Sequence, residues 1–302
     1  MEDNMQMQET PVVKKESKAG KWAKTILSGI GMVLLYLAIQ GLVGLVAGII
    51  KMVSIMAQGT MEMADLMTKY QEEAMSAEFL TPVATIATLI CAIIFVLWYK
   101  LKYAKKYSME KLKGTIKNVF CANNTVMFIL AAITCYLIAL DVVTVISIVN
   151  PAKVEKYSNT MNMVLGGNGV LAFITAVILA PISEECFLRG LVLRKALNNI
   201  PAVAAVIMSA VLFGILHTNI VQGLYVLPLG LATGYAVYKT NSVLPAIFFH
   251  FVYNLTPRLL SLLPKEVLNM DWIWVFAPIV PLVALIILWR RNKGVAANDD
   301  ES

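Results

Sequence analysis

Charge is scarce in this sequence. Charged residues make up 15% of the 302 positions and hydrophobic residues 59%, and the mean hydropathy is +0.72. A soluble globular domain usually carries about 25% charged residues. The shortage of charge therefore excludes an ordinary soluble domain and indicates a polytopic membrane protein.

Cysteine is also rare. The chain has four, in or beside apolar runs and without the paired spacing of zinc-finger or redox sites: Cys91, Cys121, Cys135 and Cys186. Cys186 follows two glutamates, but nothing beside it in the sequence supplies the base that would activate a nucleophile. We expect all four cysteines to be packing residues.

Long apolar runs determine the fold class. A membrane-spanning helix needs about 20 mostly apolar residues, and the runs that approach or reach this length are Thr25–Ile50, Leu80–Tyr99, Thr125–Val149, Gly169–Glu184, Ile200–His217, Ile220–Tyr238, Val243–Leu263 and Trp272–Trp289. We predict an all-α polytopic membrane helix bundle with about eight transmembrane helices. The fourth run meets charge soonest, so its helix is expected to continue toward Leu197.

The basic residues predict the orientation, because Lys and Arg in short flanking loops stay cytoplasmic. The leading tail is rich in lysine, the first loop is acidic, and every even-numbered loop is basic. Eight spans then place both termini in the cytoplasm of an integral membrane protein, which we assign to the plasma membrane. The net charge of +6 is explained by basic residues at the bilayer surface. We expect contact with the lipid bilayer and no nucleic-acid partner.

Ionisable residues inside the apolar runs are few. They are Asp141, Glu184, Glu185, Arg189, His217 and His250, and the two histidines are the only ones in the chain. Charges in hydrocarbon are costly and persist where they pair or do chemistry. These residues are therefore the best functional pointers in the sequence.

The stretch "ILAPISEECFLRG" holds two adjacent glutamates. Neighbours on a helix point about 100° apart, whereas residues four apart share a face. Glu185 and Arg189 can therefore form an ion pair. Glu184 is left to face the bundle interior, where a carboxylate is a candidate general base.

The depth of each group in the membrane limits which of them can meet. With about 1.5 Å rise per residue and the turn near Asn198–Pro201 as apex, Glu184 lies roughly 20 Å before it and His217 roughly 25–30 Å after it. These two can meet. His250, roughly 10 Å into its run, joins them only if the fourth and fifth helices project beyond the bilayer or the seventh begins earlier.

Each group alone fits a structural role, since a single intramembrane His or a Glu–Arg pair commonly packs or pairs. Taken together, two Glu, two His and Asn254 supply a base for water, donors for an oxyanion and candidate metal ligands. This is the inventory that a peptidase needs.

Three short segments resemble a known pattern. "EECFLR" (Glu184–Arg189), "FGILH" (Phe213–His217) and "HFVYN" (His250–Asn254) are similar, in order and rough spacing, to the three motifs of the CPBP family of intramembrane proteases. That family includes CAAX prenyl proteases and bacteriocin-processing or immunity proteins. The resemblance covers about residues 169–263.

The resemblance implies a role for each motif residue. Glu184 would activate water and His217 would help to bind it. His250 and Asn254 would stabilise the oxyanion. Glu185 and Arg189 would hold the site together, and Phe213 would shape the wall beside His217.

The cofactor stays open at this point. Glu184, His217 and His250 could supply three ligands to one divalent metal such as zinc, with an open fourth position, but the motif His-Glu-x-x-His is absent. A metal-free mechanism through the glutamate uses the same residues. The sequence also lacks a Gly-x-Ser serine and the Gly-Asp pattern of other intramembrane proteases.

On this basis we divide the chain into four parts: a basic cytoplasmic tail (1–24), two transmembrane helices with an acidic external and a basic cytoplasmic loop (25–118), a CPBP-like catalytic core (119–263), and a last transmembrane helix with a cytoplasmic tail (264–302). We predict an intramembrane endopeptidase that acts on a peptide or membrane-protein substrate of the CAAX-like or bacteriocin type. The oligomeric state stays open.

Two other functions would use the same polar residues. A non-catalytic membrane scaffold for bacteriocin immunity or for regulating a partner membrane protein would use the polar cluster only to hold helices together. A proton-coupled transporter would use the same Glu and His, but the sequence shows no repeated halves with paired broken spans.

Overall fold

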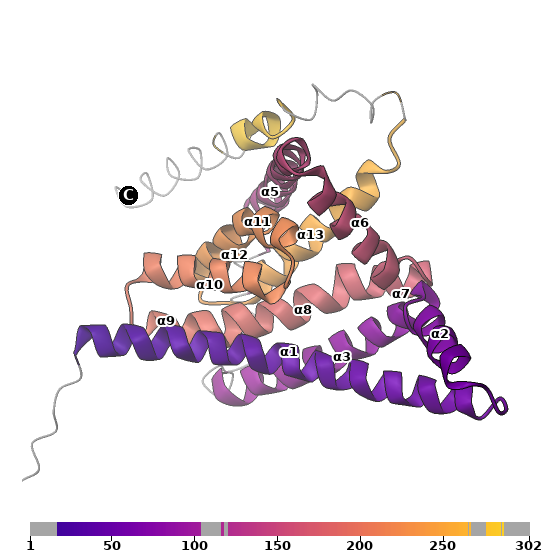
Figure 1. Cartoon of the computed structure of the whole chain (residues 1–302). Helices are drawn as coiled ribbons and strands as arrows, with labels where there is room; N and C mark the ends of the chain where they lie inside the picture. The colour runs from indigo at the N-terminus through magenta and orange to yellow at the C-terminus, as the bar shows by residue number, and fades with distance from the viewer. Residues whose placement is uncertain are drawn as a thin grey trace, which may run out of the picture.

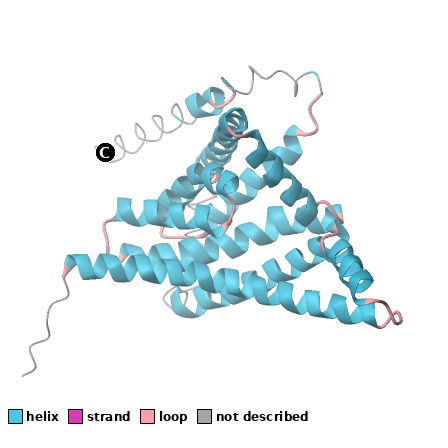
Figure 2. Ribbon diagram, viewed as in Figure 1, coloured by secondary structure: helices cyan, strands magenta, loops and turns pink. Residues whose placement is uncertain are grey.

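A computed structural model describes residues 17–103, 116–117, 120–264, 266, 276–284 and 286. Within these residues every regular element is helical (Figure 2). The fold is an all-α membrane helix bundle, as the sequence predicts.

The first three helices form one side of the bundle (Figure 1). They are α1 (Lys18–Met56), α2 (Met63–Ala74) and α3 (Ala77–Tyr103). The Ser17 hydroxyl caps α1 by accepting a hydrogen bond from the Gly20 amide at 3.1 Å. The short α2 lies against α1, to which Glu73 is tied by a 2.8 Å ion pair with Lys51.

Two further helices follow, and the second of them contacts α3, where the Thr81 hydroxyl donates to the Val164 carbonyl at 2.9 Å. They are α5 (Ala122–Val149) and α6 (Pro151–Leu165). Asn150 separates them, because its side chain caps α6 through the Lys153 amide and Pro151 occupies the first turn of α6, where its missing N–H costs nothing.

The fourth apolar run forms one continuous helix from Gly169 to Leu197. It consists of α7 (Gly169–Phe173), the π-helical turn η2 (Ile174–Leu179), α8 (Ala180–Glu185), a second π-helical segment η3 (Cys186–Leu193), and α9 (Arg194–Leu197). The helix runs through both glutamates to Leu197, as expected from the sequence.

The remaining helices are α10 (Ala202–Leu216), α11 (Ile220–Tyr225), α12 (Leu227–Thr240) and α13 (Leu244–Leu260). The sequence predicts one span over Ile220–Tyr238, and this is wrong: the run is broken at Val226. Pro228 stands in the first turn of α12, and because proline lacks an N–H and clashes with the preceding turn, a helix cannot run through it unperturbed.

Among the described residues, four helices are long and apolar enough to cross a membrane. They are α1, α3, α5 and the composite helix Gly169–Leu197, and α10 is a shorter apolar helix. Their outer faces carry exposed apolar side chains, as on α1, where Leu34 and Leu45 are each 61% exposed, and such faces suit lipid. The total of eight spans stays a prediction. Most of its eighth member, Trp272–Trp289, lies outside the described residues.

Aromatic packing fixes the composite helix against the first side of the bundle. Tyr36 stacks on Phe95 with ring centroids 5.2 Å apart, and Phe187 tilts against both, at 5.0 Å from Tyr36 and 4.7 Å from Phe95. All three side chains are buried. Phe187 lies two residues beyond Glu185, so this cluster helps to set which way the glutamate segment faces.

Candidate active site

Glu184 and Glu185 lie at the end of α8, between two π-helical segments. In η2 the amide of Ala180 donates to the carbonyl of Thr175, which is the wide i to i−5 register of a π-helix. The next bond in that register would join residue 181 to the Ala176 carbonyl, but Pro181 has no N–H to give. The wide turn therefore leaves the Ala176 carbonyl in need of a donor.

Asn254 supplies that donor. Its side-chain amide on α13 donates to the Ala176 carbonyl at 2.7 Å. A buried carbonyl without a partner is costly, so this bond fastens α13 to the composite helix about two turns before the glutamates. Asn254 keeps a second amide hydrogen for another acceptor.

Glu185 and Arg189 form the ion pair that their spacing predicts. Arg189 Nε lies 3.1 Å from Glu185 Oε2, and both side chains are fully buried. The two atoms attract electrostatically without hydrogen-bond geometry. Arg189 also donates from Nη2 to the Gly230 carbonyl at 3.0 Å, and its guanidinium lies 4.7 Å from the centroid of Phe213. Arg189 thus joins the composite helix to α10 and α12.

The second oxygen of Glu185 binds His250. The His250 Nδ1 and Glu185 Oε1 are 2.9 Å apart, and His250 is 3% exposed. A carboxylate accepts, so Nδ1 carries the hydrogen and Nε2 points away from Glu185. The sequence does not predict this contact, since the two residues are 65 positions apart and share no helix.

Glu184 faces the other nitrogen of His250. Its Oε2 lies 3.9 Å from His250 Nε2, and the side chain is 14% exposed. This oxygen is buried and has no hydrogen-bond partner among the described residues. A separation of 3.9 Å exceeds a direct hydrogen bond and is a distance that one water molecule can bridge. Glu184 is therefore held less closely than Glu185, through this long contact with His250.

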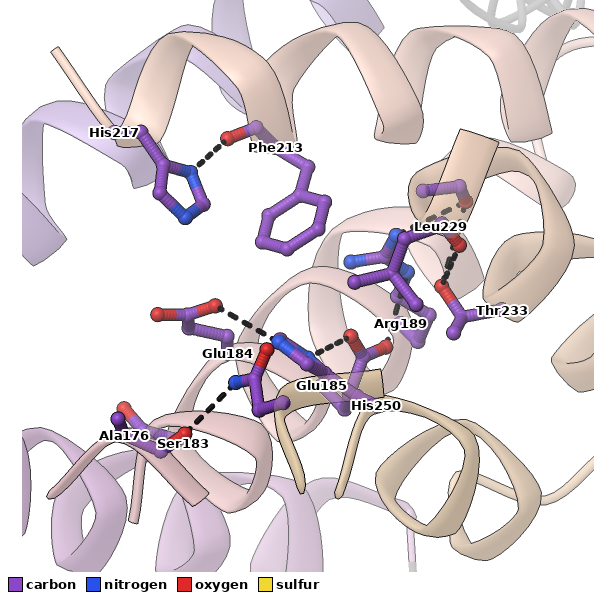
Figure 3. Close-up of polar contacts among 12 residues, drawn as sticks. Ala176, Ser183, Glu184, Glu185, Arg189, Phe213, His217, Leu229, Thr233 and His250 are labelled. Atoms are coloured by element: carbon purple, nitrogen blue, oxygen red, sulfur yellow. Dashed lines mark hydrogen bonds and ion pairs between the residues drawn. The ribbon is translucent and has the colours of Figure 1, made fainter. Parts of the chain in front are cut away.

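His217 approaches the same space from the end of α10, where it caps the helix. Its Nδ1 is 2.9 Å from the Phe213 carbonyl. A carbonyl only accepts, so Nδ1 carries the hydrogen and the neutral ring offers Nε2 as an acceptor. Figure 3 shows the His217 and Glu184 side chains directed toward one another.

Phe213 forms a wall between the histidines, as the resemblance implies. Its buried ring stands edge-on to His217 and His250, with centroids 4.9 and 5.6 Å away. The three motifs therefore meet at one place. Glu184, Glu185, Arg189, Phe213, His250 and, through Ala176, Asn254 form one connected cluster, and His217 borders it.

Sequence reasoning missed two residues that position this site. The Tyr36 hydroxyl and the Ser183 hydroxyl are hydrogen-bonded at 2.9 Å in the core. Ser183 precedes Glu184, so the contact fixes the rotation of α8 beside the candidate base. A tyrosine within an apolar run gives no sequence signal for this role, because its partner is 147 positions away.

The predicted zinc ligands were tested on this geometry. Both histidines have the donor chemistry of metal ligands, since Nδ1–H is held by an oxygen and Nε2 is exposed to the site. Yet no group of three or more His, Cys, Asp or Glu side chains converges closely enough to hold a metal ion within the part of the chain that the structure describes. The described side-chain positions therefore do not form a ready zinc site.

Comparison with known proteins identifies the segment that carries the site. Residues 166–256 match the family model described as "Type II CAAX prenyl endopeptidase Rce1-like". This segment holds the composite helix from α7 onward and extends into α13, including all three motifs. No curated protein and no solved structure matches the chain.

Proposed function

We propose that the chain is an intramembrane endopeptidase of the CPBP type in which Glu184 activates water. The match of residues 166–256 to the Rce1-like family model supports this proposal. The substrate is a membrane-associated peptide or protein whose end resembles a prenylated CAAX sequence. The chemistry takes place between α8, α10 and α13.

One observation supports this proposal above the others. Glu184 Oε2 is buried, has no hydrogen-bond partner among the described residues and faces His250 Nε2 at 3.9 Å. Its neighbour Glu185 also has an oxygen, Oε2, without a hydrogen bond, but that oxygen pairs with Arg189 at 3.1 Å, and the other binds His250 at 2.9 Å. A general base must be free to take a proton. A carboxylate that holds a cation and a histidine in place is not free in this way. We therefore assign the two carboxylates separate tasks.

The steps follow from these positions. A water molecule donates one hydrogen to Glu184 and the other to the acceptor Nε2 of His217. Glu184 takes the proton while the water oxygen attacks the peptide carbonyl. The resulting oxyanion accepts a hydrogen bond from the second amide hydrogen of Asn254, whose first is held by Ala176. Glu184 then returns its proton to the leaving amine, and the C–N bond breaks.

In this proposal the orientation of the His250 ring is fixed by Glu185. Because Glu185 holds Nδ1, the ring presents Nε2 to the reacting groups, and protonation of Nε2 would turn it into a second donor for the oxyanion. Arg189 in turn holds Glu185. The cluster is thus preorganised before substrate binds.

The proposal is tested on the full-length protein purified in detergent. A library of peptides with prenylated and unprenylated CAAX ends is incubated with wild type and with Glu184→Ala, and products are identified by mass spectrometry. We expect wild type to cut and Glu184→Ala not to cut. Glu72→Ala, which alters an exposed glutamate on α2, is the matched control and should cut as wild type does.

The same assay with and without a chelator addresses the metal. Unchanged cleavage in the chelator supports the glutamate-activated water, and lost cleavage that added zinc restores would contradict the metal-free steps. Cleavage by Glu184→Ala at the wild-type rate would contradict the role of Glu184. No cleavage of any peptide by wild type would favour the scaffold function.

A further inference from the structure

A small cavity lies far from the candidate active site, between α1, α3 and the end of the composite helix. Its volume is about 80 Å³. The polar lining consists of Thr25 and Ser28 from α1, Lys102 from α3 and Lys195 from α9, with Trp98 beside them. In Figure 1 the first residues of α1 and the end of the composite helix, α9, lie at the same side of the molecule.

The charge of this lining is of one sign. It has two lysines and no carboxylate. Lys195 donates to the Ser28 hydroxyl at 2.5 Å and keeps further N–H donors. The three chain segments that line the cavity, 18–50, 98–103 and 186–197, contain no Asp or Glu at all. Two ammonium groups with no carboxylate beside them in the lining that the structure describes favour an anion there.

The rest of the lining is apolar. It consists of Gly29, Met32, Leu191 and Val192, beside Trp98. The lining of the cavity is therefore part polar and part apolar, and its volume of about 80 Å³ has room for a compact anionic group but not for an acyl chain.

Tryptophans place the cavity at the level of lipid headgroups. Trp98 lines it, and Trp22, 39% exposed, lies on α1 one turn before Thr25. Tryptophan is enriched where a membrane meets water. Exposed apolar side chains follow on the outer face of α1, among them Ile26 and Leu27, and these offer a surface along which acyl chains can lie.

We propose that this cavity binds the phosphate of an anionic phospholipid, with Lys102 and Lys195 on the phosphate and the acyl chains along the outer face of α1. Basic pockets between membrane helices bind acidic lipid headgroups by this chemistry. The site combines α1 and α3 with Lys195 at the end of the composite helix, and it does not depend on the proposed peptidase activity.

The full-length protein in detergent provides the test. Retention of phosphatidylglycerol and phosphatidylcholine is compared by native mass spectrometry for wild type, Lys102→Gln/Lys195→Gln and Lys18→Gln/Lys100→Gln. The second pair removes the same charge from exposed lysines of α1 and α3 that do not line the cavity. We expect wild type to favour phosphatidylglycerol at least tenfold, the size expected for two basic residues near an anionic surface.

The cavity pair should lose this preference at least tenfold and the control pair less than twofold. Equal loss in both pairs, or loss in neither, would overturn the site. Inorganic phosphate added in the millimolar range should not displace the lipid; if it displaces the lipid and raises the unfolding temperature of wild type alone, the ligand is a free anion and the lipid assignment is wrong.

The Lys102→Gln/Lys195→Gln variant could lose lipid because it misfolds. A second experiment therefore keeps both lysines. The fluorescence of Trp98 is the difference between wild type and Trp98→Phe. Brominated phosphatidylglycerol should quench this difference more than brominated phosphatidylcholine does. Equal quenching of this difference by both lipids would overturn the proposal.

Discussion

Two adjacent glutamates both face His250 but differ in how closely they are held. Glu185 is fully buried and its two oxygens face Arg189 and His250. Glu184 is 14% exposed and one of its oxygens has no hydrogen-bond partner among the described residues. Identical side chains one position apart therefore have a holding role and a candidate reactive role.

The first prediction concerns the holding role. Glu185→Gln removes the negative charge that faces Arg189 and leaves a fully buried cation uncompensated. Removing one partner of a buried pair costs about 3–5 kcal/mol, and the amide oxygen of Gln recovers part of it. We expect a clearly lower unfolding temperature in detergent. Glu72→Gln on the exposed face of α2 is the control, and an unchanged midpoint for Glu185→Gln would contradict the pair's holding role.

Sequence reasoning reached some of these contacts and missed others. The i to i+4 spacing is enough to predict the Glu185–Arg189 pair, because helical geometry alone brings the two together. The bonds of Glu185 with His250 and of Tyr36 with Ser183 join positions 65 and 147 apart. Such contacts depend on how helices pack, which no local pattern records.

At the scale of elements, the composite helix is shaped by its two π-helical segments. Its apolar run and its end at Leu197 follow from composition, but the hydrogen-bond register does not. Pro181 marks the place in the sequence, and the consequence, a carbonyl that Asn254 must satisfy, appears only in three dimensions. π-helical turns often occur at functional sites.

A double-mutant cycle tests the link between Pro181 and Asn254. Asn254→Ala in wild type leaves the Ala176 carbonyl without a donor and should cost about 1–3 kcal/mol of unfolding free energy. In Pro181→Ala the restored amide can bond that carbonyl, so the same substitution should cost about 1 kcal/mol less.

The control for this cycle is Asn199→Ala. Asn199 also donates to a backbone carbonyl, that of Lys195 at 2.8 Å, on an exposed surface. Its cost should be the same with and without Pro181. Strictly additive effects of Pro181→Ala and Asn254→Ala would show that the proline does not create the need for the donor.

The close approach of α12 to α10 gives a third prediction. A Cβ on Gly230 would lie 3.0 Å from Cα and Cβ of Ala210 and 3.4 Å from Arg189 Nη2. Gly230→Ala should push the helices apart, disturb the carbonyl that Arg189 uses, and cost about 1–3 kcal/mol. Unfolding by denaturant measures this.

Gly234→Ala on the same helix is the matched comparison. Its Cβ would meet only the Val206 side chain, at 3.1 Å, which can turn aside more easily than backbone. We expect a smaller cost than for Gly230→Ala. Equal costs at the two glycines would contradict the argument from Ala210 and Arg189.

At the scale of the whole molecule, the sequence predicts the class of fold well and the number of spans less well. Apolar runs locate α1, α3, α5 and the composite helix because a bilayer imposes length and composition on any helix that crosses it. The apolar run over α11 and α12 predicts one helix, because hydropathy gives no sign of the break at Val226, just before Pro228. Orientation, membrane identity and domain division stay predictions.

One pH dependence follows from the link between α1 and α2. Lys51 donates to Glu73 and holds the pKa of that carboxyl below its ordinary value of 4.5. Because the folded pKa is the lower one, the link contributes above the unfolded pKa and is lost as the pH falls through the folded pKa. We expect α2 amides to exchange hydrogen faster, relative to α1, at acidic pH.

Lys51→Gln is the control for that dependence. It removes the positive charge that lowers the pKa of Glu73, so the exchange of α2 relative to α1 should change less between neutral and acidic pH. An unaltered pH profile in Lys51→Gln would assign the effect to another group.

The central claim is that Glu184 acts as the base and Glu185 holds Arg189 and His250. The most direct test measures the cleavage rate and the unfolding temperature of Glu184→Gln and of Glu185→Gln. A general base contributes about 10²–10⁴-fold. We predict that Glu184→Gln loses activity by that order while its unfolding temperature stays near wild type, and that Glu185→Gln unfolds at a clearly lower temperature. Full activity in Glu184→Gln, or an equal loss of stability in both variants, would contradict it.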